Sequence, residues 1–125
     1  MSGNPGPGGW AALIDDEMQS GPLLWVTNNE AEAYAILMAA MALPYGTHAV
    51  LFTDSQLCLK WFGRRGKCSN RRINDLSHAY RVVCDALDLN IRIVKVKGHR
   101  TCQGNLRADR EAVRQRNIAR RLIRE

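Results

Sequence analysis

Apolar and polar residues alternate along the chain in a pattern that predicts a mixed α/β domain. Two short apolar runs, residues 10–14 and 23–27, flank a polar stretch at 15–22 that is rich in turn-forming residues. Apolar runs of this length, separated by a turn, are typical of antiparallel strands, so we expect a β-hairpin. Asp15 and Asp16 lie in its expected turn.

A helix is predicted directly after the hairpin. Thr27 and Glu30 have the spacing of a capping box, in which each side chain accepts a hydrogen bond from the backbone amide of the other residue. Apolar residues then recur at intervals of three and four, which places them on one buried face. They are Ala33, Ile36, Leu37, Ala40 and Leu43. Pro44 is expected to end this helix.

Predicted strands and helices alternate through the rest of the chain. Residues 48–53 are an apolar run that we interpret as a buried strand, and residues 90–96 are a strand rich in β-branched side chains. Helices are predicted at residues 55–62, at residues 73–87 and from about residue 105 to the C-terminus. This order indicates a mixed sheet covered by helices, an α/β layer architecture. The length fits one domain, residues 1–125.

The chain is strongly basic, which favours a polyanionic partner. Its 125 residues carry a formal net charge of +6. Basic side chains gather in the predicted loop at 63–72 and in the last predicted helix, which has seven arginines from Arg107 to Arg124. A solvated basic face is the alternative interpretation of each group.

Composition also limits the class of protein. No apolar run is long enough to span a membrane, and the N-terminus opens into Gly and Pro rather than into a signal peptide. We therefore expect a cytoplasmic protein. The four cysteines include no C-x-x-C pair of the kind that holds zinc or carries out redox chemistry, so we interpret them as reduced thiols.

Three acidic residues are candidates for one metal site. Glu32 lies near the start of the first predicted helix, Asp54 follows the strand at 48–53, and Asp109 is expected in about the first turn of the last helix. Acids at strand ends and helix starts can converge at the carboxyl edge of an α/β sheet, and their oxygens suit Mg²⁺ or Mn²⁺. A structural interpretation stays open, because Asp54 could cap a helix and a helix dipole favours Asp109.

Four motifs, taken in order, resemble type 1 ribonuclease H. They are SGNPGPGG, TNNEAE, FTDSQ and VKGH, and an Asp follows the last motif ten residues later. The resemblance covers almost the whole chain. It implies an endonuclease that hydrolyses the RNA strand of RNA/DNA hybrids, with a three-layer fold in which helices flank a mixed sheet.

The resemblance also assigns roles to individual residues. It implies that Glu32, Asp54 and Asp109 are catalytic metal ligands, and that two Mg²⁺ or Mn²⁺ ions bind in the complete family site. His99 matches the histidine of a mobile loop that assists proton transfer or product release. Asp15 and Asp16 are expected to lie away from this site.

One element of the family is expected to be absent from this chain. In the family, SGNPGPGG closes a tight turn that follows a first, central strand, and that strand ends in a catalytic Asp bridging both metals. This sequence begins at Met1, inside the turn. Without that strand, the hairpin and the strand at 48–53 would each have an unpaired interior edge. Three explanations stay open: a start that lies upstream, a strand supplied by another segment or chain, as in a strand-swapped dimer, and a degenerate relative. The activity of these 125 residues alone is therefore an open question.

Small polar side chains resemble the family's contacts to the hybrid. They are Asn4, Thr27, Asn28, Asn29 and Gln56. Amide and hydroxyl groups can contact 2′-hydroxyls and base edges without reading sequence. Local roles are compatible with this one, since Asn4 precedes a proline in a turn and Thr27 caps a helix.

The basic loop is expected to contribute to hybrid binding. Arg64, Arg65 and Lys67 resemble a shortened form of the family's basic handle and would bind phosphates. Trp61 and Phe62 precede the loop and could stack on bases, although we expect one of the two in the core.

Two functions of different classes follow. The first is a ribonuclease that hydrolyses RNA/DNA hybrids with two divalent metals. The alternative is a catalytically impaired or inactive protein of the same fold that binds hybrids or another partner. A metal-independent RNA-binding protein would leave TDSQ and VKGH unexplained.

Overall fold

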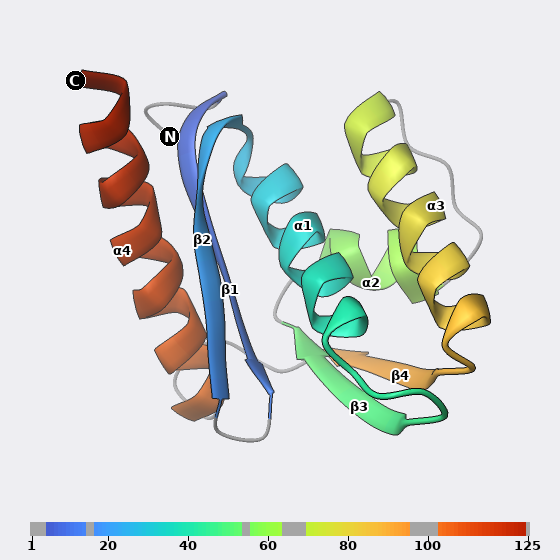
Figure 1. Cartoon of the computed structure of the whole chain (residues 1–125). Coiled ribbons are helices and arrows are strands. Elements are labelled where there is room, and N and C mark those ends of the chain that lie inside the picture. Colours follow the sequence, from blue (N-terminus) through green and yellow to red (C-terminus); the bar gives the residue numbers. More distant parts are fainter. Residues whose placement is uncertain (1–4, 15–16, 54–55, 64–69, 96–102, 125) are drawn as a thin grey trace.

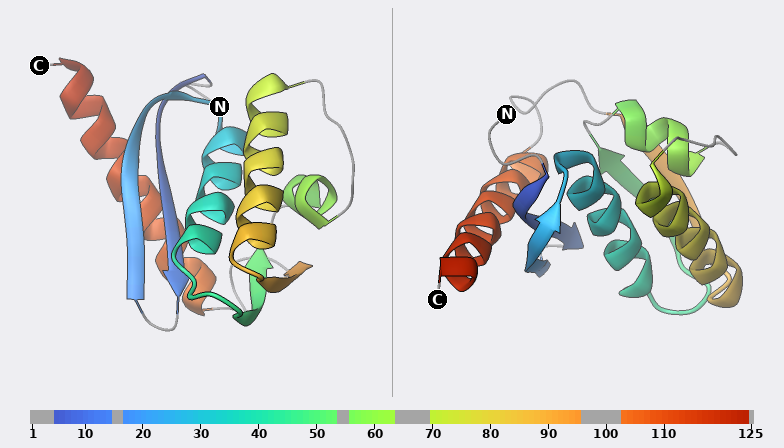
Figure 2. Two further views of the ribbon diagram at one scale, coloured as in Figure 1. Left: turned by 45° about the vertical axis from the view of Figure 1, so that its right-hand side comes forward. Right: turned by 90° about the horizontal axis from the view of Figure 1, so that it is seen from above.

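The computed structural model describes residues 5–14, 17–53, 56–63, 70–95 and 103–124. Its elements follow the order β1-β2-α1-β3-α2-α3-β4-α4, which confirms the predicted order (Figure 1). The β1–β2 hairpin lies between α4 and α1, whereas β3 and β4 lie on the side of α2 and α3 (Figure 2). Among the helices of the described ranges, none has a stretch that is both long and apolar enough to cross a bilayer.

The predicted hairpin is present, with longer strands than expected. Strands β1 (Gly6–Ile14) and β2 (Glu17–Val26) pair antiparallel from Ile14↔Glu17 to Gly6↔Val26. The polar stretch that we expected to be a turn therefore belongs mostly to β2. In an antiparallel ribbon with one face open to solvent, polar side chains can reach water without leaving the ladder.

The glycine-rich motif also differs from the expected tight turn, because Gly6 to Gly9 lie within β1. Another backbone approaches the motif closely at Gly9. A Cβ atom there would overlap the carbonyl oxygen of Ala112 and the amide nitrogen of Arg116 on α4 (Gln103–Arg124). Glycine therefore allows the helix to pack directly on the strand.

Helix α1 (Asn28–Met41) begins with the predicted capping box. The Glu30 amide donates to Thr27 Oγ1 at 3.1 Å, and the Thr27 amide donates to Glu30 Oε1 at 2.8 Å. The helix ends at Met41, before Pro44. Four members of the predicted apolar face are buried: Ala33, Ile36, Leu37 and Ala40.

The main core lies between α1, α2 (Gln56–Gly63) and α3 (Arg71–Ala86). Trp61 and Phe62 are only 7% and 6% exposed, so both belong to the core and the base-stacking role suggested for them is wrong. The Phe62 ring packs edge-on against Tyr80, and the Ser77 hydroxyl donates to the Trp61 carbonyl at 3.0 Å. Helix α3 thereby fixes the end of α2.

Strands β3 (His48–Thr53) and β4 (Asn90–Lys95) pair in parallel, with His48 opposite Asn90 and Thr53 opposite Lys95. The expectation that β3 is a buried strand is wrong, because Val50 is 54% exposed and Phe52 is 56% exposed. In the described part of the chain, β3 pairs only with β4 and β1 only with β2. The strands of the predicted mixed sheet thus form two separate two-stranded sheets.

Candidate active site

A cavity of about 560 Å³ separates the two sheets and brings two of the predicted acids together. Glu32, on the second turn of α1, and Asp109, on α4, both line it. Glu32 is exposed and Asp109 is half-buried. Thr53, the last residue of β3, lines the same cavity. Acidic residues from two helices that are distant in sequence therefore line one space.

The position of Asp109 within its helix differs from the prediction. Because α4 begins at Gln103, Asp109 lies in the second turn rather than the first. Stabilisation of an acid by the helix dipole falls off within the first turn. The dipole therefore does not explain why an acid stands at position 109. Its place at the cavity is better explained by the packing of α4 on β1.

Several predicted site residues lie outside the part of the chain whose side chains the structure describes. They are Asn4, Asp54, Gln56, Arg64, Arg65, Lys67 and His99. In the sequence, Asp54 directly follows Thr53, the residue of β3 that lines the cavity. The roles of all seven residues remain predictions.

The predicted polar contacts at the start of α1 are close to Glu32 in sequence. Thr27 has the capping role described above, and Asn28 is exposed in the first turn of the helix. Asn28 and Glu32 are four residues apart, so they lie on the same face of α1. Asn29, the third predicted contact, is half-buried.

Sequence reasoning missed a cluster that fixes the start of α1. Glu30 is buried, and Asn70 Nδ2 donates to its Oε2 at 3.0 Å. Asn70 also caps α3, because its Oδ1 accepts from the Ile73 amide at 3.2 Å. Arg72 lies 3.6 Å from Glu30 Oε1 and donates to the Trp25 carbonyl at 2.8 Å. The cluster joins the N-terminal ends of two helices, one of which carries Glu32.

The Glu30 carboxyl is held in its ionised form. Burial raises its pKa, but hydrogen bonds from Thr27 and Asn70 and the charge of Arg72 lower it, and the net pKa is below the ordinary value. The capping-box spacing identified Glu30 as a cap. The partner Asn70, 40 residues away, becomes visible only in the fold.

A second acid on α4 anchors that helix to the hairpin. Ser20 on β2 donates to Glu111 Oε2 at 2.5 Å, and Gln115 Nε2 donates to the same oxygen at 2.8 Å. Arg114 Nε lies 2.9 Å from the other oxygen. Hydrogen bonds from Arg114, Ser20 and Gln115 lower the pKa of Glu111 to about 2, against a smaller opposing effect of burial. The contacts of Glu111 with Arg114 and Gln115 follow from helical spacing in the sequence, whereas its contact with Ser20 depends on the fold.

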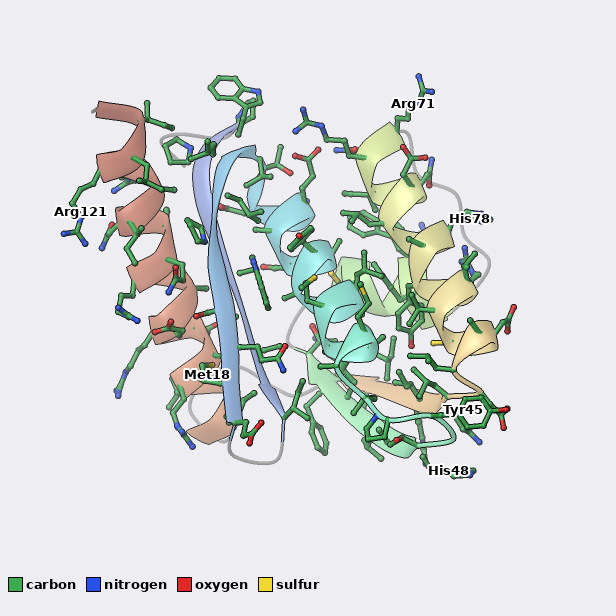
Figure 3. All side chains as sticks on the ribbon, in the orientation of Figure 1. Met18, Tyr45, His48, Arg71, His78 and Arg121 are labelled. Carbon is green, nitrogen blue, oxygen red and sulfur yellow. The ribbon has the colours of Figure 1, made fainter. Side chains whose placement is uncertain are left out.

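Described residues of the two basic groups lie on different sides of the molecule. Arg71, at the start of α3, and Arg121, near the end of α4, point outward from opposite sides (Figure 3). Arg107, Arg110 and Arg121 on α4 are exposed. Within the basic loop group, Arg72 is engaged with Glu30 and Trp25.

Among the described residues, the two acids that line the cavity suit a hard divalent cation. Glu32 and Asp109 offer carboxylate oxygens, which Mg²⁺ and Mn²⁺ prefer. Within the described ranges, no three His, Cys, Asp or Glu side chains lie close enough together to hold a metal ion. The pair would need at least one further ligand.

Comparisons with known proteins agree with this arrangement. A family model described as RNase H matches residues 1–117. A ribonuclease H of Rickettsia bellii is 34% identical over 131 aligned residues, which cover 94% of this chain and 84% of the relative. A ribonuclease H of Thermus thermophilus is 35% identical, with 90% of this chain and 76% of the relative covered.

Solved structures confirm the predicted RNase H-like fold. The N-terminal RNase H domain of a Mycobacterium tuberculosis protein, solved as a fusion with maltose-binding protein, has a TM-score of 0.78 at 24% identity, and the match covers 97% of this chain and 90% of that one. RNase H1 from the archaeon Halobacterium salinarum has a TM-score of 0.71 at 25% identity, with 94% of this chain and 91% of that one covered.

Proposed function

This chain belongs to the RNase H family, and we propose that it hydrolyses the RNA strand of RNA/DNA hybrids with divalent metal ions. The observation that carries the proposal is the shared cavity of Glu32 and Asp109, two acids from helices that are distant in the sequence. The names of its relatives, ribonuclease H in Rickettsia bellii and Thermus thermophilus, support the same activity.

We assign the metal ligands as Glu32, Asp109 and Asp54, the residue that follows the cavity-lining Thr53. Two bound Mg²⁺ or Mn²⁺ ions would lower the pKa of the attacking water and stabilise the leaving oxygen of the RNA. Residues of this chain orient that site. The Glu30 cluster fixes the start of α1 and so the position of Glu32, and Glu111 fixes α4 and so the position of Asp109.

Hybrid binding is assigned to polar and basic groups around the site. Thr27, Asn28 and Asn29 begin the helix that carries Glu32, where small polar groups can contact 2′-hydroxyls. Asn4 and Gln56 are proposed to join them, and Arg64, Arg65 and Lys67 to bind phosphates. His99 is proposed to donate or accept a proton during turnover. A cytoplasmic location, one domain over residues 1–125 and a strand-swapped dimer remain predictions.

Cleavage of a labelled RNA/DNA hybrid with Mg²⁺ and with Mn²⁺ tests this function. Asp109→Asn keeps nearly the same volume and removes a proposed metal ligand. Loss of a residue that only supports a metal ligand typically lowers activity by roughly 10- to 100-fold. We expect Asp109→Asn to lower cleavage by more than this, with the circular dichroism spectrum unchanged. Asp54→Asn should behave in the same way.

Asp85→Asn is the matched control, since Asp85 is an exposed acid on α3 that does not line the cavity. It should cleave like the parent chain. If Asp109→Asn retains full cleavage while folding normally, the proposed active site is wrong.

A second candidate function is hybrid binding without efficient cleavage. The observation that favours it is the separation of the two described sheets, which leaves the walls of the proposed site without a joining strand. Saturable binding of a hybrid, with no cleavage at any concentration of Mg²⁺ or Mn²⁺, would show that the protein binds hybrids without cleaving them.

A further inference from the structure

Arginines form a continuous stripe along the outer face of α4. Exposed polar side chains recur there at intervals of three and four positions, which places them on one face of the helix. They are Arg107, Arg110, Arg114, Asn117 and Arg121, and we call them the arginine stripe. Arg121, near the end of the stripe, points away from the molecule (Figure 3).

The face of α4 that packs on the hairpin is a different one. Gln115 and Ala119 are buried, and the backbone of Ala112 comes close to Gly9 of β1. Successive helical residues point about 100° apart, so the centre of the arginine stripe lies roughly opposite these three residues. In Figures 1 and 2, no other described element covers that outer side of α4.

Most of the net charge of the chain is on this helix. Helix α4 carries seven arginines and two acids, so its net charge is +5, whereas that of the whole chain is +6. All of its basic residues are arginines. A guanidinium can bind two phosphate oxygens through parallel hydrogen bonds, which an ammonium group cannot do. The composition of α4 therefore favours a phosphate-bearing partner.

The two acids of α4 leave the stripe available to such a partner. Asp109 lines the cavity, and the oxygens of Glu111 accept hydrogen bonds from three side chains. One of the three donors is Arg114, which uses Nε and Nη2 and whose side chain is 65% exposed. A guanidinium has five N–H donors, so a phosphate can accept from the others.

We propose that the arginine stripe binds the phosphate backbone of a nucleic acid duplex, outside the cavity and without reading base sequence. The stripe runs over residues 107–121, which is about 21 Å of helix at 1.5 Å per residue. A duplex carries one phosphate charge per roughly 1.7 Å of its axis, so it presents about twelve phosphates over that length. The backbone is common to DNA, RNA and hybrid duplexes, and the inference does not depend on RNA cleavage.

The exposed apolar side chains of α4 favour this partner over a lipid surface. A helix that lies in a membrane interface presents one large apolar face to the acyl chains. On α4, Val113 and Leu122 are exposed, but at about 100° per residue they lie on opposite sides of the helix. The described apolar residues thus form no continuous face beside the stripe.

Fluorescence anisotropy with labelled DNA, RNA and hybrid duplexes of about 20 base pairs, each longer than the stripe, tests the proposal in EDTA at several salt concentrations. Arg110→Gln combined with Arg121→Gln removes two of the proposed phosphate contacts. At 50 mM salt we expect binding of all three duplexes to weaken about tenfold or more, and the slope of log K against log salt to become shallower by about 1.8. Both side chains are exposed, so the circular dichroism spectrum should not change.

Two further variants separate position from charge. Arg92→Gln combined with Val82→Glu lowers the net charge by the same amount at exposed positions on β4 and α3. This control should keep the salt slope of the parent chain. Arg110→Lys combined with Arg121→Lys keeps the charge of the stripe, so it should restore the slope and leave only a smaller loss of affinity.

Three results would overturn the proposal. The first is the parent's salt slope in the folded Arg110→Gln, Arg121→Gln variant. The second is an equal loss of binding in the Arg92→Gln, Val82→Glu control, which would mean that only the net charge matters. The third is binding to vesicles of anionic lipid that the Gln variant abolishes, with no binding of any duplex by the parent chain, which would make a membrane surface the partner.

Discussion

At the scale of single residues, two acids two positions apart on α4 have different tasks. Asp109 lines the cavity between the sheets, whereas Glu111 hydrogen-bonds to Ser20 on β2. Neighbouring positions on a helix point about 100° apart, so positions two apart face different neighbours. Glu111 thus fixes the helix that carries Asp109 at the cavity.

Glu111 should make stability depend on pH in the acid range. Its folded-state pKa is about 2 against an ordinary value of 4.5, so the folded state favours the carboxylate. The stabilisation is fully present above about pH 4.5 and is lost as the pH falls toward 2. Glu111→Gln should therefore be less stable than the parent at pH 7, and the gap should narrow between pH 4.5 and 2. Urea unfolding at several pH values measures this, and a gap independent of pH would contradict it.

His99→Ala should slow turnover without abolishing it. General acid–base groups typically contribute about 10²- to 10⁴-fold, and water can partly replace a histidine. Single-turnover cleavage and hybrid binding should be measured together, with His78→Ala, a change on α3, as the control. Complete loss of hybrid binding in His99→Ala would contradict the proposed role.

At the scale of elements, the features predicted best from the sequence were those that depend on neighbouring residues. The capping box of Thr27 and Glu30 and the apolar face of α1 depend on residues within a few positions of one another. Both were predicted correctly, except that Leu43 lies beyond the end of the helix. The exposure of β3 was not, because burial of a strand depends on what lies beside it. The partners of Glu30 and Glu111 come from other elements, so only the fold reveals them.

The basic loop after α2 offers a prediction at this scale. Replacing Arg64, Arg65 and Lys67 together by Ala should weaken hybrid binding, and the slope of log K against log salt should become shallower by about 0.9 for each phosphate that is no longer bound. Replacing Arg110, Arg120 and Arg121 on α4 removes the same charge from the other basic region and provides the comparison. Binding measured at several salt concentrations gives both slopes. An unchanged slope in the loop variant would mean that its side chains are solvated surface.

At the scale of the whole molecule, the separation of the two sheets affects both stability and the site. The family resemblance predicts a central strand between the hairpin and β3, and the described strands of the two sheets line one cavity there. Glu32 and Asp109 line the same cavity, so a strand placed in it would also lie beside the proposed metal ligands. Stability and catalysis should therefore both depend on whether a strand fills this cavity.

Joining a strand to the N-terminus tests this dependence. An extension of about ten residues, apolar and β-branched and ending in an Asp-Gly-Ser-like segment, should pair with both edges and raise the free energy of unfolding. Each apolar side chain that it buries fully contributes about 1.5–3 kcal/mol. The added Asp would supply a further carboxylate beside Glu32 and Asp109, so Mg²⁺-dependent cleavage should rise as well.

A matched extension with Asn in place of that Asp separates the two effects. It should gain the same stability without the gain in cleavage. Denaturant unfolding and hybrid cleavage on the three chains measure these outcomes. If the 125-residue chain is a monomer as stable as the extended ones and cleaves hybrids as fast, then neither an added strand nor a further carboxylate limits this protein.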